Sequence, residues 1–237
     1  MEIDILSLFP EYFCGPFDVS IIKRAREKGL IKINLTDIRA FGEGTYQRVD
    51  DRPFGGGPGM VLMPGPLTKA IRSVKKEGSH TIYLSPQGKP LTSERLQELA
   101  SQRHLVLVCG HYEGIDQRVI DSEVCEEISI GDYVLTNGCL AAIVLVDALI
   151  RWIPGVLGHA QAPYEDSFAS GIFDAPHYTK PVVFEGKEVP AVLRGGNHAL
   201  IAAWRRKEAI IKTSRVRPDI LMENENERKQ IDKPATS

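Results

Sequence analysis

The segment Ile128–Gly138, with the sequence ISIGDYVLTNG, decides the fold of this chain. A short apolar strand breaks there into a loop flanked by glycines, and a long apolar segment typical of a helix follows directly. Gly131 and Gly138 have no side chain, so the main chain can approach a ligand closely at both positions. An ordinary strand-to-helix turn has the same pattern, so the rest of the chain has to discriminate between the two interpretations.

Two other apolar runs also end in loops that contain Gly or Pro. The run Leu105–Val108 leads into a polar trio between two glycines, within Val108–Asp116 (VCGHYEGID), and a strand-like segment opens Tyr83–Gly88 (YLSPQG). A third notable segment is Asp50–Met60 (DDRPFGGGPGM), which contains a run of glycines. Together these segments favour a functional site over a simple turn.

Five short apolar runs alternate with helical patterns, which is typical of a mainly parallel α/β sheet flanked by helices. The predicted strands are Ile3–Phe9, Ile31–Leu35, Thr81–Leu84, Leu105–Cys109 and Glu127–Ile130, and the predicted helices span residues 17–28, 66–76, 92–102 and 140–153. The ligand crevice of such a sheet lies at the carboxyl ends of its strands. We therefore expect the loops that begin near Ser85, Gly110 and Ile130 to converge on one site.

The glycine run Gly55–Gly59 matches neither common phosphate-binding template. No predicted strand runs into GxGxxG, and GxxxxGK[ST] does not occur in the chain. The run is either a flexible surface loop or the ligand loop of an α/β enzyme that binds a phosphate compound. The absence of a lysine directly after the run disfavours the second interpretation.

Length and composition indicate a soluble globular protein. The 237 residues exceed the usual size of one domain, so one large or two unequal domains are expected. The chain is 43% hydrophobic and 25% charged, with a net charge of −2, so any nucleic-acid site has to come from a local basic patch or from two copies brought together. Four cysteines without CxxC spacing favour neither zinc nor a disulfide scaffold, and we expect reduced, mostly buried thiols in the cytoplasm.

No membrane segment is expected. The longest apolar segment, from Leu140 to Ile153, carries Asp147 and Arg151, and it is shorter than the roughly 20 residues that a membrane-spanning helix needs. The N-terminus enters a strand-like run without the basic region of a secretory signal.

The C-terminal part of the chain differs in character. Residues 160–176 are polar and irregular, which is typical of a linker, and Asn197 can cap a helix from His198 to about Thr213. Between Trp204 and Arg217 the chain has one acid, Glu208, and six basic residues: Arg205, Arg206, Lys207, Lys212, Arg215 and Arg217. They form either a solvated helix face or an RNA contact beside Trp204. Residues 222–237 lack apolar periodicity, which predicts a frayed tail.

Two more blocks, Arg151–Gly158 (RWIPGVLG) and Glu165–Phe168 (EDSF), complete a pattern that resembles the bacterial tRNA (guanine-N1)-methyltransferase family of the knotted SPOUT superfamily. The resemblance covers nearly the whole chain, from Leu6–Pro10 (LSLFP) to Trp204 and Arg205. It implies a mainly parallel α/β sheet with a deep trefoil knot, a topology that is otherwise almost never seen. It also implies three parts: a SPOUT domain over residues 1–160, a linker over 161–175, and a small, mostly helical tRNA-binding domain over 176–237.

The resemblance implies that the protein transfers the methyl group of S-adenosyl-L-methionine to N1 of guanosine-37, just 3′ of the tRNA anticodon. A site made of backbone groups and apolar walls suits the cofactor, because adenine needs hydrogen-bond partners on its edge and apolar contacts on its faces. The matching cofactor positions are Tyr83, Leu84, Ser85, Pro86, Gly110, Glu113, Ile130, Gly131, Asp132, Tyr133, Val134, Leu135 and Gly138.

Two residues occupy the family's catalytic positions. Guanine N1 carries a proton at neutral pH, and Asp166 is the implied general base that removes it. Arg151 is implied to stabilise the negative charge that develops on guanine O6. The structural alternative for Arg151 is an ion pair with Asp147, which lies four residues earlier on the same predicted helix. The family's magnesium dependence makes Glu113, Asp166 and Asp174 candidate Mg²⁺ ligands.

The chain departs from the family after Thr136. The family commonly has Gly-Gly-Glu there, whereas this chain has Asn137, Gly138 and Cys139. Asn tolerates a left-handed backbone better than most residues, so we expect the loop to keep its shape, but residue 139 can no longer supply an acid. The resemblance further implies a homodimer with active sites shared between subunits. The alternative is a SPOUT-type RNA-binding protein that holds the cofactor without catalysis, which the presence of both Asp166 and Arg151 disfavours.

Overall fold

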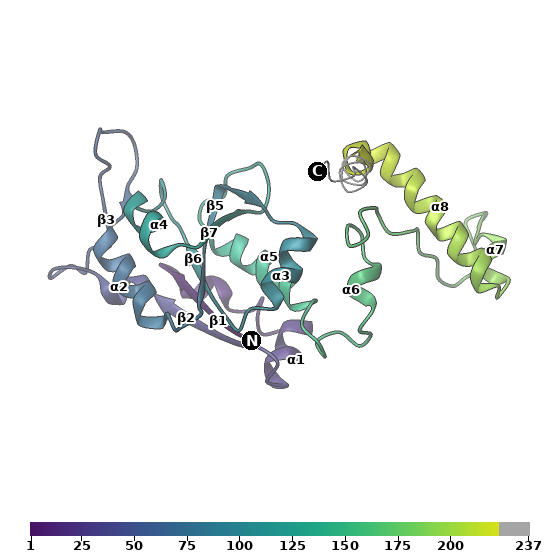
Figure 1. Ribbon diagram of the computed structural model, residues 1–237, viewed down its shortest axis with the longest axis horizontal. Helices are drawn as coiled ribbons and strands as arrows, with labels where there is room; N and C mark the ends of the chain where they lie inside the picture. Colours follow the sequence, from purple (N-terminus) through teal and green to yellow (C-terminus); the bar gives the residue numbers. More distant parts are fainter. Residues whose placement is uncertain (223–237) are drawn as a thin grey trace, which may run out of the picture. The chain divides into compact units, whose positions relative to one another are not determined.

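The computed structural model describes residues 1–222, and the predicted frayed tail lies beyond this described range except for Met222. The chain divides into two compact units, Met1–Ala160 and Gln161–Ser237 (Figure 1). Residues 161–175, for which the sequence predicts a linker, belong to the second unit.

The first unit is built on a five-stranded sheet in which every neighbouring pair is parallel. The order across the sheet is β2-β1-β6-β5-β7. The strands are β1 (Glu2–Ser7), β2 (Lys32–Asp37), β5 (His80–Pro90), β6 (His104–Cys109) and β7 (Glu126–Ser129). All five strands correspond to the five predicted apolar runs, so the prediction of a mainly parallel sheet is confirmed.

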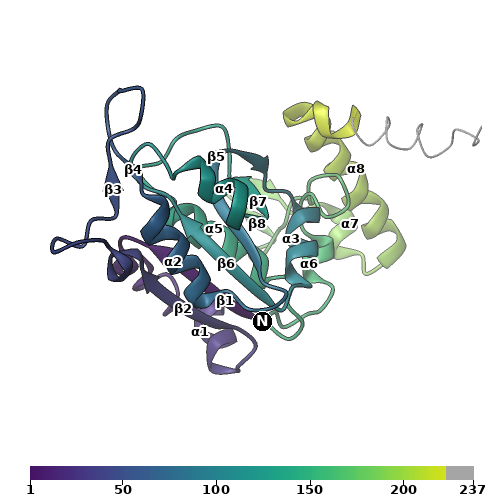
Figure 2. The same cartoon turned by 60° about the vertical axis from the view of Figure 1, so that its left-hand side comes forward.

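Helices cover both faces of this sheet (Figures 1 and 2). The α-helices of the first unit are α1 (Ser20–Glu27), α2 (Pro64–Val74), α3 (Ser93–Ala100), α4 (Gln117–Glu123) and α5 (Cys139–Ile150). Short 3-10 helices, η1 (Pro10–Phe13) and η2 (Ile38–Phe41), follow β1 and β2. The sequence did not predict α4, which has only seven residues; Asp116 begins it by accepting a hydrogen bond from the backbone N–H of Arg118.

The alternation of side chains along each strand creates two separate cores. On β6, Leu105 and Leu107 join the core beneath α1, α3 and α5, whereas Val106 and Val108 join the core beneath α2 and α4. Successive strand residues point to opposite faces, so a strand covered on both sides has to be apolar at every position. This requirement explains the uninterrupted apolar run that identified β6 in the sequence.

The Gly55–Gly59 run lies in an exposed loop of the first unit. This loop follows β3 (Asp50–Asp51), which pairs in antiparallel fashion with β4 (Val61–Leu62). Gly55, Gly56 and Gly57 have positive φ angles, and nothing lies within 4 Å of the positions that their Cβ atoms would occupy. These observations agree with a surface loop rather than with a phosphate-binding turn at a helix N-terminus.

The second unit is mainly helical. It contains α6 (Ala162–Glu165), a hairpin of β8 (Val183–Phe184) and β9 (Lys187–Glu188), α7 (Ala191–Arg194) and α8 (His198–Val216). Asn197 caps α8 as predicted, because its side-chain oxygen accepts hydrogen bonds from the backbone N–H groups of Ala199 and Leu200. No helix among the described residues is long and apolar enough to span a membrane.

Candidate functional site

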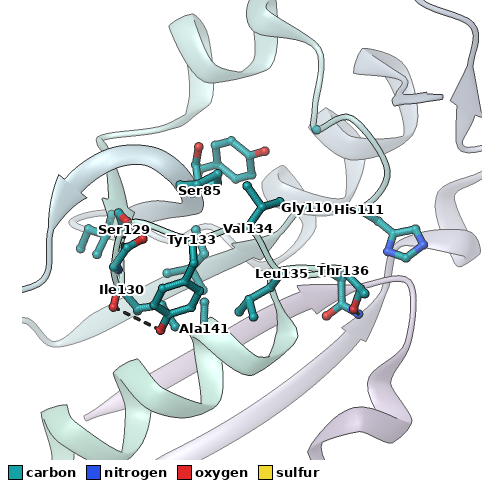
Figure 3. A pocket seen from close by; sticks show the side chains of 18 of the residues that line it. Ser85, Gly110, His111, Ser129, Ile130, Tyr133, Val134, Leu135, Thr136 and Ala141 are labelled. Carbon is teal, nitrogen blue, oxygen red and sulfur yellow. Dashed lines mark hydrogen bonds between the residues drawn. The ribbon is translucent and has the colours of Figure 1, made fainter. Parts of the chain in front are cut away.

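A cavity lies where the carboxyl ends of β5, β6 and β7 meet (Figure 3). Its volume is about 190 Å³, and its walls come mostly from the loops that follow β6 and β7 and from residues 83–86 within β5, at a bulge of that strand. The lining residues are Tyr83, Leu84, Ser85, Pro86, Gly110, His111, Tyr112, Glu113, Gly114, Ile128, Ser129, Ile130, Gly131, Tyr133, Val134, Leu135, Thr136, Asn137, Gly138 and Ala141. The segments near Ser85, Gly110 and Ile130 therefore converge as expected, although Ser85 lies within β5 and not in a loop after it.

The loop after β6 is shaped around the buried ring of Tyr83. A Cβ atom at Gly110 would lie 2.9 Å from the Tyr83 hydroxyl, and one at Gly114 would lie 3.2 Å from it. The Tyr83 hydroxyl accepts a hydrogen bond from the backbone of Ile115, while burial and the charge of Glu127 raise the pKa of Tyr83 to about 12. The phenol therefore stays neutral at physiological pH and packs against the loop after β6.

The loop after β7 is held by its own side chains. The Ser129 hydroxyl donates to the Gly131 carbonyl (3.0 Å) and accepts from the Gly131 N–H (3.1 Å). Gly131 has a φ of +148°, and a Cβ there would lie 2.5 Å from the Tyr133 ring. Tyr133 in turn reaches the carbonyl of Ile130 with its hydroxyl at 3.4 Å, the dashed line in Figure 3. Only glycine fits at position 131 without a shift of Tyr133.

The two loops meet at Gly138. Its N–H donates to the Gly110 carbonyl at 2.9 Å, and a Cβ at position 138 would lie 2.9 Å from the Cα of Cys109. Asn137 begins α5 because its side-chain oxygen accepts the N–H of Cys139 at 2.8 Å. Neither Asn137 nor Gly138 has a positive φ angle, so tolerance of left-handed backbone, which we expected to matter at Asn137, is not what preserves this loop. Asn137 acts as a helix cap instead.

The structure brings twelve of the thirteen predicted cofactor positions together around the cavity. Asp132 is the exception, because its exposed side chain does not line the cavity. The sequence did not single out His111, Tyr112, Gly114, Ile128, Ser129, Thr136, Asn137 or Ala141, although all of them line it. Most of these residues are next to a predicted position in the sequence, so their place beside those positions in the loops could have identified them.

His111 and its neighbours form an aromatic end of the cavity, on the side of the labelled residue Thr136 in Figure 3. The His111 ring lies edge-on to Phe9 at 5.2 Å and to Tyr112 at 4.2 Å between ring centroids, and Arg39 stacks over Phe9. Burial and the nearby Arg39 charge lower the pKa of His111, and within residues 1–222 its buried Nδ1 has no hydrogen-bond partner. An imidazole here is neutral at physiological pH and has hydrogen-bonding capacity to spare.

The predicted catalytic residues lie in different units. Arg151 follows the last residue of α5, and Asp166 follows the last residue of α6. A hydrogen bond ties the segment of Asp166 to that of Asp174: the Asp174 N–H donates to the hydroxyl of Ser167, the neighbour of Asp166, at 3.0 Å. The carboxylate of Asp174 also contacts Nε2 of His177 at 2.7 Å.

The candidate metal ligands do not form a site within one unit. Among residues 1–222, no three His, Cys, Asp or Glu side chains gather in a way that could hold a metal ion. Glu113 belongs to the first unit, whereas Asp166 and Asp174 belong to the second.

All four cysteines are free thiols. Cys109 and Cys139 are buried beside the cavity, whereas Cys14 and Cys125 are exposed, so the expectation of mostly buried cysteines holds for only half of them. Cys125 directly precedes β7, which is an edge strand of the sheet.

Comparisons with known proteins identify relatives of this chain. Residues 1–223 match the family described as tRNA (Guanine-1)-methyltransferase TrmD. A tRNA (guanine-N(1)-)-methyltransferase of Protochlamydia amoebophila (strain UWE25) is 64% identical over 221 residues, which are 93% of this chain and 100% of that protein. Proteins with the same name from Chlamydia pneumoniae and Chlamydia caviae are 56% and 53% identical over 94% and 96% of this chain. This chain spans 61% and 65% of the length of these two relatives.

Replacement of Gly138 by alanine tests the contact between the two loops. Gly138→Ala places a methyl group against the backbone of Cys109, so we expect a lower melting temperature and faster hydrogen exchange at the amide of residue 138. Gly158→Ala is the matched control, because its φ is not positive and nothing lies within 4 Å of its Cβ position. Equal behaviour of the two variants would show that the contact does not hold the loops.

Proposed function

The chain belongs to the tRNA (guanine-1)-methyltransferase TrmD family, and on this premise we propose that it methylates N1 of guanosine-37, the nucleoside 3′ of the anticodon in tRNA. The observation that carries the proposal is the cavity at the ends of β5, β6 and β7, which gathers twelve positions matched to the family's cofactor site. S-adenosyl-L-methionine supplies the methyl group when it is bound there.

The cavity suits this cofactor in its chemistry. Backbone groups of two glycine-containing loops offer hydrogen-bonding groups, and Leu84, Ile130 and Leu135 offer apolar walls. Ligand sites commonly combine apolar walls with a few polar groups in this way. The volume of about 190 Å³ is below the usual range of about 300–1,000 Å³, so additional surface has to complete the site.

Asp166 is the proposed general base. Guanine N1 becomes a nucleophile only when its proton leaves, and a carboxylate within hydrogen-bond reach can accept this proton as the N–C bond begins to form. The backbone around Asp166 is ordered by the Ser167–Asp174 hydrogen bond and by the bond from the Phe168 N–H to the Ile172 carbonyl (2.8 Å). Such a loop can hold a carboxylate in one orientation without help from a long helix.

Arg151 is the proposed stabiliser of the charge on guanine O6. Loss of the N1 proton leaves negative charge delocalised onto O6, and a guanidinium offers two parallel N–H donors to that oxygen and its surroundings. Arg151 directly follows the C-terminal end of α5, whereas Ala141 in the first turn of this 12-residue helix lines the cavity. The alternative role in an ion pair with Asp147 stays a prediction.

The proposal includes a magnesium ion bound by Glu113, Asp166 and Asp174. Carboxylate oxygens suit Mg²⁺, which usually keeps several waters and needs only one or two protein carboxylates. Glu113 lines the cavity, and the segments of Asp166 and Asp174 are tied together through Ser167. The chemistry described above for Asp166 and Arg151 does not depend on this ion.

We propose that the protein acts as a homodimer with shared active sites and that its first unit carries the SPOUT trefoil knot. Leu140 and Val144 of α5 are 46% and 48% exposed, and both lie on one stripe of the helix. Exposed apolar side chains on a helix whose other apolar residues are mostly buried are typical of an interface. A second copy covering this stripe would also supply the surface that the small cavity lacks.

The tRNA contact is proposed for α8 in the second unit. Arg205, Arg206 and Lys207 are exposed, and so are Lys212 and Arg215 further along the helix. Basic side chains in such a row can neutralise several phosphates, which supplies affinity without base specificity. A tRNA-modifying enzyme of this kind acts in the cytoplasm. The comparisons give no support to the alternative of a non-catalytic RNA-binding protein.

A methyl-transfer assay tests the function directly. The protein is incubated with S-adenosylmethionine labelled in its methyl group and with tRNA transcripts that differ only in the base after the anticodon. We expect label in the transcript with guanosine at this position and none in transcripts with adenosine, cytidine or uridine. Label in all four transcripts, or in none, would contradict the proposed acceptor.

Replacement of Asp166 separates proton removal from cofactor binding. Asp166→Ala should lower the single-turnover rate of methyl transfer by about 10²-fold or more, because a positioned base typically contributes that much. Cofactor affinity, measured by calorimetry, should stay unchanged. Glu165→Ala, at the exposed neighbouring acid, is the control and should keep the wild-type rate. Retention of most activity by Asp166→Ala would remove Asp166 from the role of base.

A mixture of two inactive variants tests the shared active site. Asp166→Ala removes the proposed base, and Gly131→Val disrupts the cofactor loop because a side chain at 131 collides with Tyr133. If each site takes residues from both subunits, an equal mixture of exchanged dimers recovers roughly a quarter of wild-type activity, from one intact site in half of the dimers. No recovery in mixed dimers confirmed by native mass spectrometry would show that each subunit carries a complete site.

A further inference from the structure

Two buried thiols that the proposed mechanism does not use lie at the junction of the cavity loops. Cys109 is the last residue of β6 and is 2% exposed, and Cys139 is the first residue of α5 and is 1% exposed. The two side chains are hydrogen-bonded to each other. Their direct neighbours in the chain, Gly110 and Gly138, line the cavity.

The backbone holds the two thiols side by side. The Gly138 N–H bonds to the Gly110 carbonyl at 2.9 Å, and the Cα of Cys109 lies 2.9 Å from the position of a Cβ at Gly138. The Asn137 side chain fixes the amide of Cys139 at 2.8 Å. A change in the separation of the two sulfur atoms therefore acts on the main chain that forms the cavity wall.

The surroundings make the two thiols unequal. The hydrogen bond from Cys109 lowers the pKa of Cys139 to about 7, with help from the Ser7 hydroxyl at 3.1 Å and despite burial. The same pairing, together with burial, raises the pKa of Cys109. A cysteine at the first position of a helix is also favoured as a thiolate by the backbone N–H groups there. These opposite shifts make Cys139 the more nucleophilic of the two neighbouring thiols.

We propose that Cys109 and Cys139 form a reversible disulfide under peroxide and that this bond weakens binding of S-adenosylmethionine. The identity of the ligand rests on the proposed function, whereas the disulfide rests only on the geometry of the two cysteines. The oxidant is hydrogen peroxide, because a molecule about the size of water reaches thiols this deeply buried more readily than a bulky disulfide reagent does.

The chemistry balances without another reactant. The Cys139 thiolate attacks one peroxide oxygen, the O–O bond breaks, and the departing hydroxide takes a proton to become water. Cys109 then loses its proton and attacks the sulfenic sulfur of Cys139, which releases a second water. Two thiols are oxidised to one disulfide, and one peroxide is reduced to two waters.

The new bond alters the cavity wall. A disulfide fixes its sulfur atoms about 2.05 Å apart, which is far shorter than a hydrogen bond between thiols. Formation of the bond draws the start of α5 and the end of β6 together and displaces Gly110 and Gly138. Because coupling between two equilibria is reciprocal, bound cofactor should in turn oppose oxidation of the pair.

The experiment uses the full chain with Cys14→Ser and Cys125→Ser, which removes the two exposed thiols and leaves only the buried pair. After treatment with hydrogen peroxide, intact mass should fall by two hydrogens, and peptide mapping should join residues 109 and 139. Calorimetry should show S-adenosylmethionine binding about tenfold more weakly than in the reduced protein, a change of about 1.4 kcal/mol. Dithiothreitol should restore both the mass and the affinity.

Cys109→Ser and Cys139→Ser, each made in the same background, are the controls. Cys139→Ser lacks the attacking thiolate and should keep its mass and its cofactor affinity after peroxide, whereas Cys109→Ser should form no disulfide and should gain one oxygen in intact mass at the sulfenic acid of Cys139. Circular dichroism checks that both variants are folded. If one serine variant fails to fold, the other carries the comparison. The proposal is overturned if folded protein forms no disulfide between the pair, or if the disulfide leaves cofactor affinity unchanged. Failure of the reduced protein to bind S-adenosylmethionine would overturn the proposed function instead, while the mass still decides whether the disulfide forms.

Discussion

The backbone of Gly138 packs so closely on Cys109 and Gly110 that no side chain fits between them, and the cavity depends on this contact. It joins the loop after β6 to the loop after β7, two segments that β5 separates within the sheet. Without it, the walls formed by residues 110–114 and 130–138 would move independently. The glycines at 110, 131 and 138 therefore serve first to pack protein against protein, since a Cβ at each would meet protein atoms within 3.0 Å.

The opposite end of the sheet is held by polar groups rather than by loops. The carboxylate of Asp4 contacts Nε2 of His104 at 2.6 Å, and Nδ1 of His104 contacts the Ser79 hydroxyl at 2.7 Å. Asn34 donates to the second carboxylate oxygen of Asp4 at 3.0 Å. Because Asp4 and His104 are both buried, this network satisfies groups whose desolvation would otherwise destabilise the fold. The strands are thus fixed at one end and leave their carboxyl ends to carry a site.

Local sequence predicted the elements well where one periodic signal dominated. The apolar runs on β1, β2, β5, β6 and β7 were all identified, as was α8 with its Asn197 cap. The weak elements were missed: α4 has seven residues, α6 and α7 have four each, and β3 and β4 have two each. Such short elements gain little from hydrogen bonding along the chain and form only because tertiary contacts order them.

The sequence by itself determined the parallel sheet, the three loops at its carboxyl edge and most residues of the cavity, because strand period and Gly or Pro breaks are local properties of the chain. It also carried the family pattern, which the comparisons confirm. Only the tertiary structure decided that Tyr83 supports the loop of Gly110 and that Cys109 and Cys139 share one buried site. Each of these contacts joins residues whose meeting depends on packing between elements, and no local periodicity encodes which elements pack together.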